Sequence, residues 1–142
     1  MATFISHSPA DTQALGEKFG RAARPGWVIT LSGELGAGKT QFVKGLARGL
    51  DISARVHSPT FTLAAQYPGG RLNLLHLDLY RLETPAQILS AGLEEFFPPD
   101  GVAVIEWAER LPPALRPAAC LHAQIEILDE TDRKIIYDDF GA

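Results

Sequence analysis

The segment from Gly33 to Thr40, GELGAGKT, matches the spacing G-x-x-x-x-G-K-[ST] in full. Glycines at these positions let the backbone turn so that successive N–H groups face a phosphate. Lys39 would reach the β- and γ-phosphates of a nucleoside triphosphate, and Thr40 would offer its hydroxyl to Mg²⁺. A helix that begins near Thr40 would add the positive end of its dipole at the same anion. The segment therefore predicts a site for a nucleoside triphosphate with magnesium.

Two acidic residues compete for the magnesium-binding and water-activating roles. Asp78 ends the run LNLLHLD, and Glu106 ends the run VAVIE. A carboxylate at the carboxyl end of a strand beside the loop is where a Mg²⁺ ligand or a water-orienting group lies. Either residue by itself could be an ordinary strand-end charge. Glu106 has the stronger claim to the metal, because VAVI is typical of a strand buried on both faces and the carboxylate would emerge only at its tip.

The segment His57 to Thr62, HSPTFT, places three hydroxyls around a proline about 20 residues after the glycine-rich loop. Loops that sense the nucleotide often lie at this distance, where they hold Mg²⁺-bound water or report the γ-phosphate. A plain turn before a strand remains the alternative interpretation.

Trp107 directly follows Glu106 and is either a core aromatic or a contact to nucleotide or partner. His57 and His76 have no metal-ligand spacing with each other or with Cys120. We expect both histidines to be ordinary surface or core residues with satisfied hydrogen bonds, and no zinc site.

The elements around these residues predict an α/β fold. Ser8 is a suitable cap for a helix that starts at Pro9 and ends before Pro25. Apolar runs predict strands over 27–31, 61–67, 72–77, 102–105, 121–128 and 134–140, with further helices over 41–50 and 85–90 and an irregular connector over 111–119. Strands 61–67 and 72–77 flank Pro68-Gly69-Gly70 and should form an antiparallel hairpin. The pattern favours a three-layer P-loop NTPase-like sandwich, in which a mixed sheet has a parallel centre and antiparallel edge strands.

Composition and charge limit the class of protein. The 142 residues, 46% hydrophobic and 21% charged, fit a single globular domain over 1–142. A net charge of -4 without a dense Lys/Arg run argues against a dedicated nucleic-acid groove, so we expect tRNA contact only through a complex. The single Cys120, the lack of a secretory signal and the lack of an apolar run of roughly 20 residues predict a cytoplasmic protein with no membrane span.

With GELGAGKT, SPTFTL, HLDLYRL and IEW in this order, nearly the whole chain resembles the TsaE (YjeE) family of small bacterial P-loop ATPases. The resemblance implies a Mg²⁺-dependent ATPase that is slow alone and is stimulated by its partners, the TsaB and TsaD proteins. Those partners install threonylcarbamoyl on the adenosine beside the anticodon of tRNA, and the resemblance implies that this chain resets their complex.

The resemblance also implies roles for particular residues. Thr40 and Glu106 would hold Mg²⁺, and Asp78 would assist hydrolysis. Thr60 would lie in a nucleotide-responsive loop and act with Lys39 in catalysis. The nucleotide contacts implied are Ser8, Thr12, Gly36, Ala37, Gly38, Lys39, Thr40, Gln41 and Arg133.

Two other functions remain open. A small-molecule kinase is disfavoured because Arg110, Arg116 and Arg133 are scattered rather than clustered as in a lid. A nucleotide switch that acts without hydrolysis is the second alternative, and the lack of an NKxD-type guanine-recognition motif makes ATP the expected nucleotide.

Overall fold

A seven-stranded mixed sheet with two helices makes up the part of the chain that the computed structural model describes, residues 2–34, 37–53, 64–78, 101–107 and 120–138. The elements in chain order are β1 (Ala2–Ser6), α1 (Pro9–Ala22), β2 (Val28–Ser32), α2 (Lys39–Gly49), β3 (Ala64–Tyr67), β4 (Leu74–Asp78), β5 (Val102–Glu106), β6 (Leu121–Ile127) and β7 (Arg133–Tyr137).

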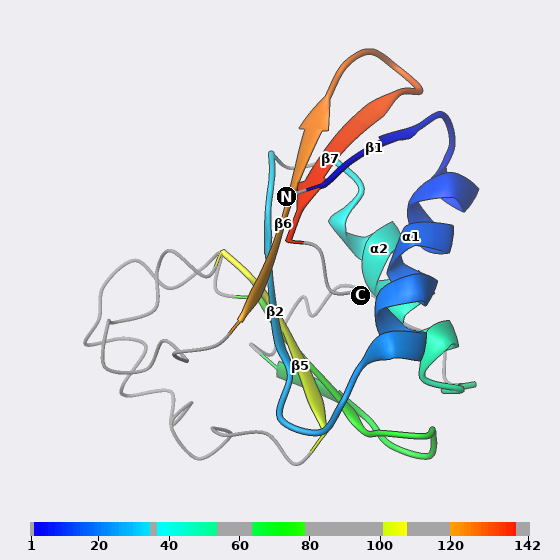
Figure 1. Cartoon of the computed structure of the whole chain (residues 1–142), viewed down its shortest axis with the longest axis vertical. Helices are drawn as coiled ribbons and strands as arrows, with labels where there is room; N and C mark the ends of the chain where they lie inside the picture. The colour runs from blue at the N-terminus through cyan, green and yellow to red at the C-terminus, as the bar shows by residue number, and fades with distance from the viewer. Residues whose placement is uncertain (1, 35–36, 54–63, 79–100, 108–119, 139–142) are drawn as a thin grey trace.

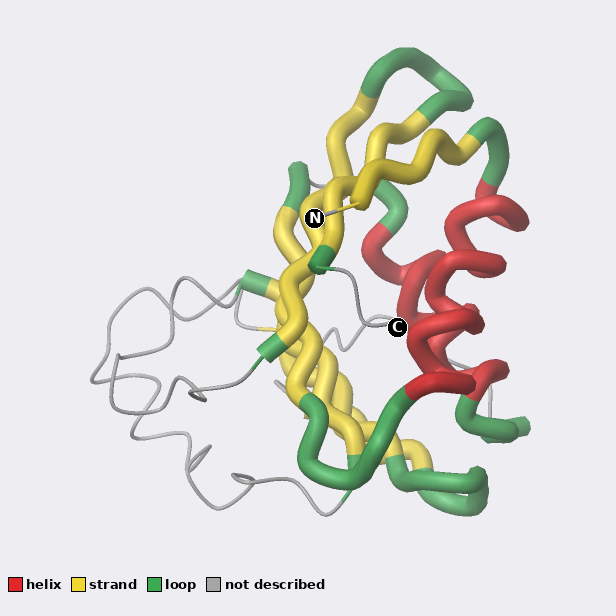
Figure 2. Tube along the Cα trace, in the orientation of Figure 1, coloured by secondary structure: helices red, strands yellow, loops and turns green. Residues whose placement is uncertain are grey.

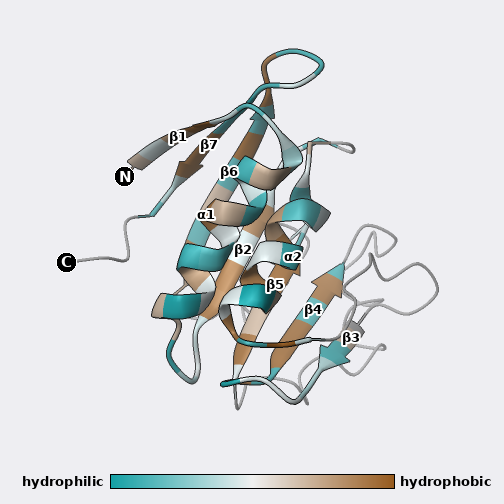
Figure 3. Ribbon diagram, turned by 90° about the vertical axis from the view of Figure 1, so that its right-hand side faces the viewer, coloured by the Kyte–Doolittle hydropathy of each residue, from teal (hydrophilic) through white to brown (hydrophobic). Residues whose placement is uncertain are grey.

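The strand order is β1-β7-β6-β2-β5-β4-β3. Strands β6, β2, β5 and β4 are parallel, whereas β1, β7 and β3 pair antiparallel with their neighbours. Figure 3 shows the strands in this order behind the two helices. The predicted α/β fold with a parallel centre and antiparallel edges is confirmed.

The parallel centre is apolar because its strands are covered on both faces. All five residues of β5 are buried, as are the first four residues of β2 and of β4. Parallel pairing aligns Leu31 with Glu106 and Asp78 with Glu106, so β2, β5 and β4 end at the same edge of the sheet. The two strand-end carboxylates are therefore neighbours.

Helices α1 and α2 both lie on one face of the sheet (Figures 1 and 2). Phe19 of α1 is fully buried and packs edge-to-face with Phe42 of α2 and Tyr137 of β7, with ring centroids 5.2 and 5.6 Å away. The described residues thus provide the sheet and one helical layer. The helix predicted over 85–90 and the connector predicted over 111–119 lie outside the described residues. No helix among the described residues is long and apolar enough to cross a membrane.

Glycines bring α1 and α2 into backbone contact. Gly16 and Gly20 of α1 face α2, and Gly45 and Gly49 of α2 face α1. A Cβ on Gly45 would stand 1.9 Å from the carbonyl oxygen of Gln13, and a Cβ at each of the other three would come within 2.4 Å of a carbonyl oxygen of the facing helix. Small residues four apart let two helices approach closely, so this pairing packs α1 directly against α2.

Most predicted elements occur close to the predicted bounds. Ser8 caps α1 as expected, its hydroxyl accepting from the Asp11 N–H at 3.2 Å, and Pro9 is the first helical residue. The strand β1 was not predicted. Its five residues alternate in burial and pair with β7 at the sheet edge, but a run this short is recognisable as a strand only once its partner is known.

Candidate functional site

A pocket of about 580 Å³ opens at the edge where β2, β5 and β4 end. Its volume falls in the range of small-molecule and cofactor sites, and its position matches the usual ligand site of an open parallel sheet. It is lined by His7, Ser8, Pro9, Thr12, Ala37, Gly38, Lys39, Thr40, Gln41, Asp78, Glu106, Trp107, Glu130, Thr131 and Arg133.

The glycine-rich loop joins β2 to α2, as its sequence predicted. Gly33 has φ +149, and a Cβ there would stand 2.6 Å from the Ile125 carbonyl oxygen, so the loop leaves β2 against the backbone of β6. Gly38 has φ +105 and occupies the N-cap of α2. A side chain is unfavourable at both positions. The amino end of α2, with its positive dipole end, therefore faces the pocket.

Lys39 is held across the loop. Its Nζ donates to the carbonyl oxygen of Gly33 at 2.9 Å, and the same ammonium lies 4.6 Å from the ring centroid of Trp107. The residue is 6% exposed, and both contacts leave it in the pocket lining. Trp107 has φ +61, a conformation that is costly for a bulky residue and that recurs at functional sites. Of the two interpretations of Trp107, the structure favours a side chain at the pocket.

Oxygen donors gather beside Lys39. Asp78 and Glu106 come from neighbouring strands, and Thr40 comes from the first turn of α2. A hydroxyl and one or two carboxylates suit Mg²⁺, which in phosphate sites keeps several waters and takes few protein ligands. Across the described residues no group of three or more His, Cys, Asp or Glu side chains could hold a metal ion.

His76 lies behind Glu106 on β4. It is fully buried, and its Nε2 is 2.5 Å from Oε2 of Glu106, which is 3% exposed. The Nδ1 atom has no hydrogen-bond partner among the described residues. His76 is thus a core histidine, as expected, but only one of its two nitrogens is satisfied.

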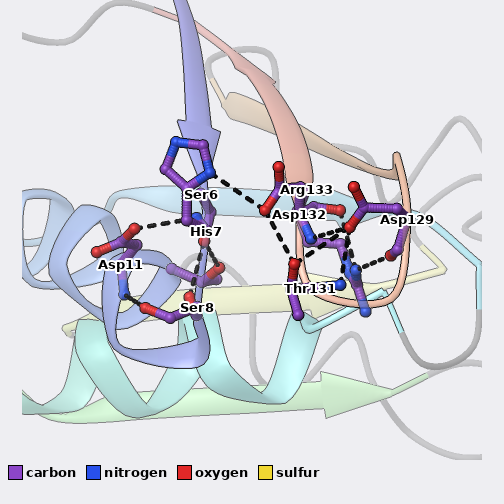
Figure 4. A network of polar contacts seen from close by, with 9 residues as sticks. Ser6, His7, Ser8, Asp11, Asp129, Thr131, Asp132 and Arg133 are labelled. Atoms are coloured by element: carbon purple, nitrogen blue, oxygen red, sulfur yellow. Dashed lines mark hydrogen bonds and ion pairs between the residues drawn. The ribbon is translucent and has the colours of Figure 1, made fainter.

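The other side of the pocket combines the start of α1 with the turn between β6 and β7 (Figure 4). Buried Ser6 and Thr12 join their hydroxyls at 2.7 Å, and the Ser6 hydroxyl also donates to the Ser8 carbonyl oxygen at 2.8 Å. His7 bridges to the turn, with Nδ1 3.1 Å from Oδ1 of Asp132. The polar side chains of Ser8 and Thr12 are therefore fixed at the pocket wall.

Asp129 folds the turn. Its Oδ1 accepts from the backbone N–H of Asp132 at 2.7 Å and of Thr131 at 2.9 Å. These backbone hydrogen bonds, first that of Asp132 and then that of Thr131, hold the pKa of the Asp129 carboxyl below its usual range.

Arg133 connects the turn to the glycine-rich loop. Its Nε donates to the Ala37 carbonyl oxygen at 3.1 Å, and its Nη1 donates to the carbonyl oxygens of Asp129 and Asp132 at 2.7 and 2.9 Å. The guanidinium thus lies at the pocket wall, and its N–H groups link the turn, drawn in Figure 4, to the glycine-rich loop.

The structure brings together ten of the residues that the sequence and the family resemblance proposed for the site. They are Ser8, Thr12, Ala37, Gly38, Lys39, Thr40, Gln41, Asp78, Glu106 and Arg133. Gly36 and Thr60 lie outside the described residues. Sequence reasoning missed His7, Pro9, Glu130 and Thr131, which carry no motif, and it missed the contact between His76 and Glu106.

A strand, a glycine-rich loop and a helix at the edge of a parallel sheet define the P-loop class of α/β proteins, and this chain has that unit. Comparisons with known proteins place it more closely. The model of the family "Threonylcarbamoyl adenosine biosynthesis protein TsaE" matches residues 6–135. The chain belongs to the TsaE family.

Relatives at high coverage agree. Proteins named tRNA threonylcarbamoyladenosine biosynthesis protein TsaE from Bacillus subtilis (strain 168) and Treponema pallidum (strain Nichols) are 41% identical over 134 residues and 44% identical over 131 residues. These matches cover 94% and 92% of this chain and 83% and 96% of the relatives. The crystal structure of Bacillus subtilis YdiB superposes with a TM-score of 0.81 at 36% identity, covering 99% of this chain and 86% of that one. The predicted family is confirmed.

Proposed function

We propose that this chain binds ATP with Mg²⁺ and hydrolyses it, as an accessory protein in the formation of threonylcarbamoyladenosine in tRNA. The observation that carries the proposal is one pocket in which the amino end of α2, the Lys39 ammonium and two strand-end carboxylates converge. Cationic and dipolar groups next to carboxylates suit a phosphate chain with its metal. We assign this function to one domain over residues 1–142.

Lys39 and the backbone N–H groups at the amino end of α2 would hold the β- and γ-phosphates. Thr40 and Glu106 would hold Mg²⁺ through oxygen, and the oxygen donors in the pocket fit that ion. A Mg²⁺ ion held there would supply positive charge that offsets the negative charge of the transferring phosphoryl group.

Asp78 would orient the water that attacks the γ-phosphate. It ends β4 directly beside Glu106 and lines the same pocket. Because the transition state of phosphoryl transfer is loose, positioning and charge supply most of the catalysis, and a carboxylate that fixes the water suffices. Thr60 would sense the γ-phosphate from the segment 57–62.

Ser8, Thr12 and Arg133 would contact the part of the nucleotide away from the γ-phosphate. They line the pocket on the side of the α1 start and the β6–β7 turn. Hydroxyl and guanidinium donors suit the ribose and phosphate oxygens.

The names of the relatives supply the biological setting, tRNA threonylcarbamoyladenosine biosynthesis. We propose that the chain resets a complex of the TsaB and TsaD proteins and meets tRNA only through that complex. The net charge of -4 supports this indirect contact, because a tRNA-binding surface needs clustered positive charge. The proposed compartment is the cytoplasm.

The test is ATP turnover by the full chain measured alone, with TsaB and TsaD together, and with candidate small-molecule acceptors. We expect slow hydrolysis alone and a marked increase with the two partners. Phosphate transferred to a small acceptor would establish a kinase instead. Tight ATP binding without turnover under every condition would establish a switch that acts by binding.

A further inference from the structure

His76 and Glu106 form a buried ionisable contact at the pocket. Glu106 lines the pocket, whereas His76 does not. His76 stands on β4 opposite Val104, two residues before the position opposite Glu106. The imidazole therefore reaches the carboxylate diagonally from within the sheet core rather than from the side where a ligand would bind.

The hydrogen bond from His76 involves only one of the two carboxylate oxygens of Glu106, Oε2. A carboxylate that binds a metal ion can accept hydrogen bonds but cannot donate them, so in that state Nε2 of His76 is the donor and Oε2 of Glu106 the acceptor. Side-chain torsions of a glutamate allow many carboxylate orientations, and a donor fixed by the sheet selects one of them. Among the described residues the structure records no hydrogen bond from a side chain to Oε1.

The fixed orientation of the Glu106 carboxylate matters because Asp78 lies next to it. Asp78 is the direct partner of Glu106 in the parallel register, so two acidic residues are neighbours at the strand ends. Like charges opposite each other on neighbouring strands repel. The hydrogen bond from His76 holds one oxygen of Glu106 towards the core. It therefore keeps the Glu106 carboxylate from rotating in response to the negative charge of Asp78.

A purely structural role explains the pair poorly. His76 is fully buried within β4, and its Nδ1 has no hydrogen-bond partner in the described part of the chain. A buried polar atom without a partner disfavours folding, and an apolar side chain would fill a buried strand position without that cost. What the imidazole provides, and an apolar residue would not, is the N–H at Glu106.

We propose that His76 is a positioning residue that holds the Glu106 carboxylate in the orientation required to bind Mg²⁺. This inference rests on the proposed function, because it concerns the same magnesium site. A histidine that donates its Nε2–H to a metal-binding carboxylate is an outer-shell contact, the kind that sets both the orientation and the affinity of a ligand.

The test compares His76→Gln with His76→Asn. The amide nitrogen of glutamine reaches the position of Nε2, whereas that of asparagine reaches only the position of Nδ1. Affinity for ATP is measured by calorimetry on the full chain, once with Mg²⁺ and once with EDTA. We expect His76→Asn to lose about tenfold or more of the Mg²⁺-dependent gain in affinity, with the affinity in EDTA nearly unchanged. His76→Gln should retain most of the gain.

Two further variants separate positioning from folding. His122 donates or accepts at Thr30 Oγ1 (2.6 Å) and Ser32 Oγ (3.1 Å) and does not line the pocket, so His122→Asn should keep the full Mg²⁺ effect. In a Glu106→Gln background, His76→Asn should have no further effect on Mg²⁺ dependence. Thermal melts of all variants show which of them fold.

The outcomes are distinct. If ATP binding by the unmodified chain shows no dependence on Mg²⁺, both the magnesium site and this inference are wrong. If the unmodified chain depends on Mg²⁺ and His76→Asn depends on it equally, the inference is wrong and the proposed function stands. Equal losses with Mg²⁺ and with EDTA, or equal losses in the Gln and Asn variants, would also overturn it, because they indicate a structural role.

Discussion

The two sides of the pocket are assembled in different ways. The loop side, formed by Gly33–Thr40 and the strand ends at Asp78 and Glu106, follows the chain from β2 into α2 and meets its neighbours through parallel register. The turn side, formed by Ser6–Thr12 and Asp129–Arg133, joins residues from opposite ends of the chain. The loop side shows how one local motif can place the groups proposed to bind an anion. The turn side shows how residues that are distant in sequence complete the lining of the same pocket.

Among the described residues, an arginine and the packing of two helices link the two sides. Arg133 donates from the turn side to the Ala37 carbonyl oxygen on the loop side. The glycine contacts hold α1, which begins on the turn side, against α2, which begins on the loop side. We expect the largest effects on nucleotide affinity from variants on the loop side, because the proposed phosphate and metal contacts lie there. Variants on the turn side and at these links should have smaller effects.

The largest effect is expected for Lys39→Ala. The ammonium is fixed at the pocket by Gly33 and Trp107, and its removal takes away the charge that we propose contacts the β- and γ-phosphates. Charge-assisted hydrogen bonds of about 1.5–3 kcal/mol each predict a loss of about a hundredfold or more in ATP affinity, measured by calorimetry. Lys44→Ala, on the exposed side of α2, is the matched control. Unchanged affinity in Lys39→Ala would refute the assignment of the loop.

The second effect separates the two carboxylates. Glu106→Ala should weaken the Mg²⁺ dependence of ATP binding by about tenfold or more, because it removes a proposed metal ligand. Asp78→Ala should mainly slow turnover and change Mg²⁺ dependence less. Magnesium titrations of binding and of hydrolysis for the two variants make the comparison. The reverse ranking would exchange the two roles.

The third effect concerns the link between the helices. Gly45→Ala places a methyl group 1.9 Å from the Gln13 carbonyl oxygen, so the helices must separate. Alanine favours an exposed helix by about 1 kcal/mol over glycine, yet overpacking costs about 1–3 kcal/mol or more, and we expect net destabilisation. Urea denaturation measures the free energy of unfolding, with Lys44→Ala again as control. A higher free energy of unfolding for Gly45→Ala would show that the two helices can separate at little cost.

The smallest effect is expected on the turn side. Arg133→Gln removes the hydrogen bonds to Ala37, Asp129 and Asp132 and the charge at the pocket wall. At about 1 kcal/mol for a net hydrogen bond, we expect a loss of roughly three- to tenfold in ATP affinity. Arg24→Gln, an exposed residue outside the pocket lining, removes the same charge and should leave affinity unchanged. If Arg133→Gln lost as much ATP affinity as Lys39→Ala, the turn side would contribute as much to nucleotide binding as the loop side, contrary to this ranking.

Much of the loop side was predictable because its signals are local. The spacing of Gly33, Gly38 and Lys39 predicts a phosphate-binding loop. The apolar run before Glu106 indicates a buried strand with a carboxylate at its end. The parallel centre of the sheet follows from the alternation of such strands with helices. The structure confirms the elements and brings the predicted carboxylates into one register.

The turn side needed the tertiary structure, because its residues have no common spacing. Glu130, Thr131 and His7 meet at the pocket only when β1 pairs with β7 and β7 pairs with β6. The glycines at 16, 20, 45 and 49 do recur four apart, a signal that was present in the sequence but that does not say which helix faces which.

The sequence by itself determined that the chain has a P-loop, a parallel sheet and a family, because these follow from residue types at short, fixed separations. The tertiary structure decided which side chains share the pocket with that loop. Only folding brings His76 to Glu106, the β6–β7 turn to the start of α1 and Arg133 to Ala37, because those contacts depend on strand order and register rather than on neighbouring residues.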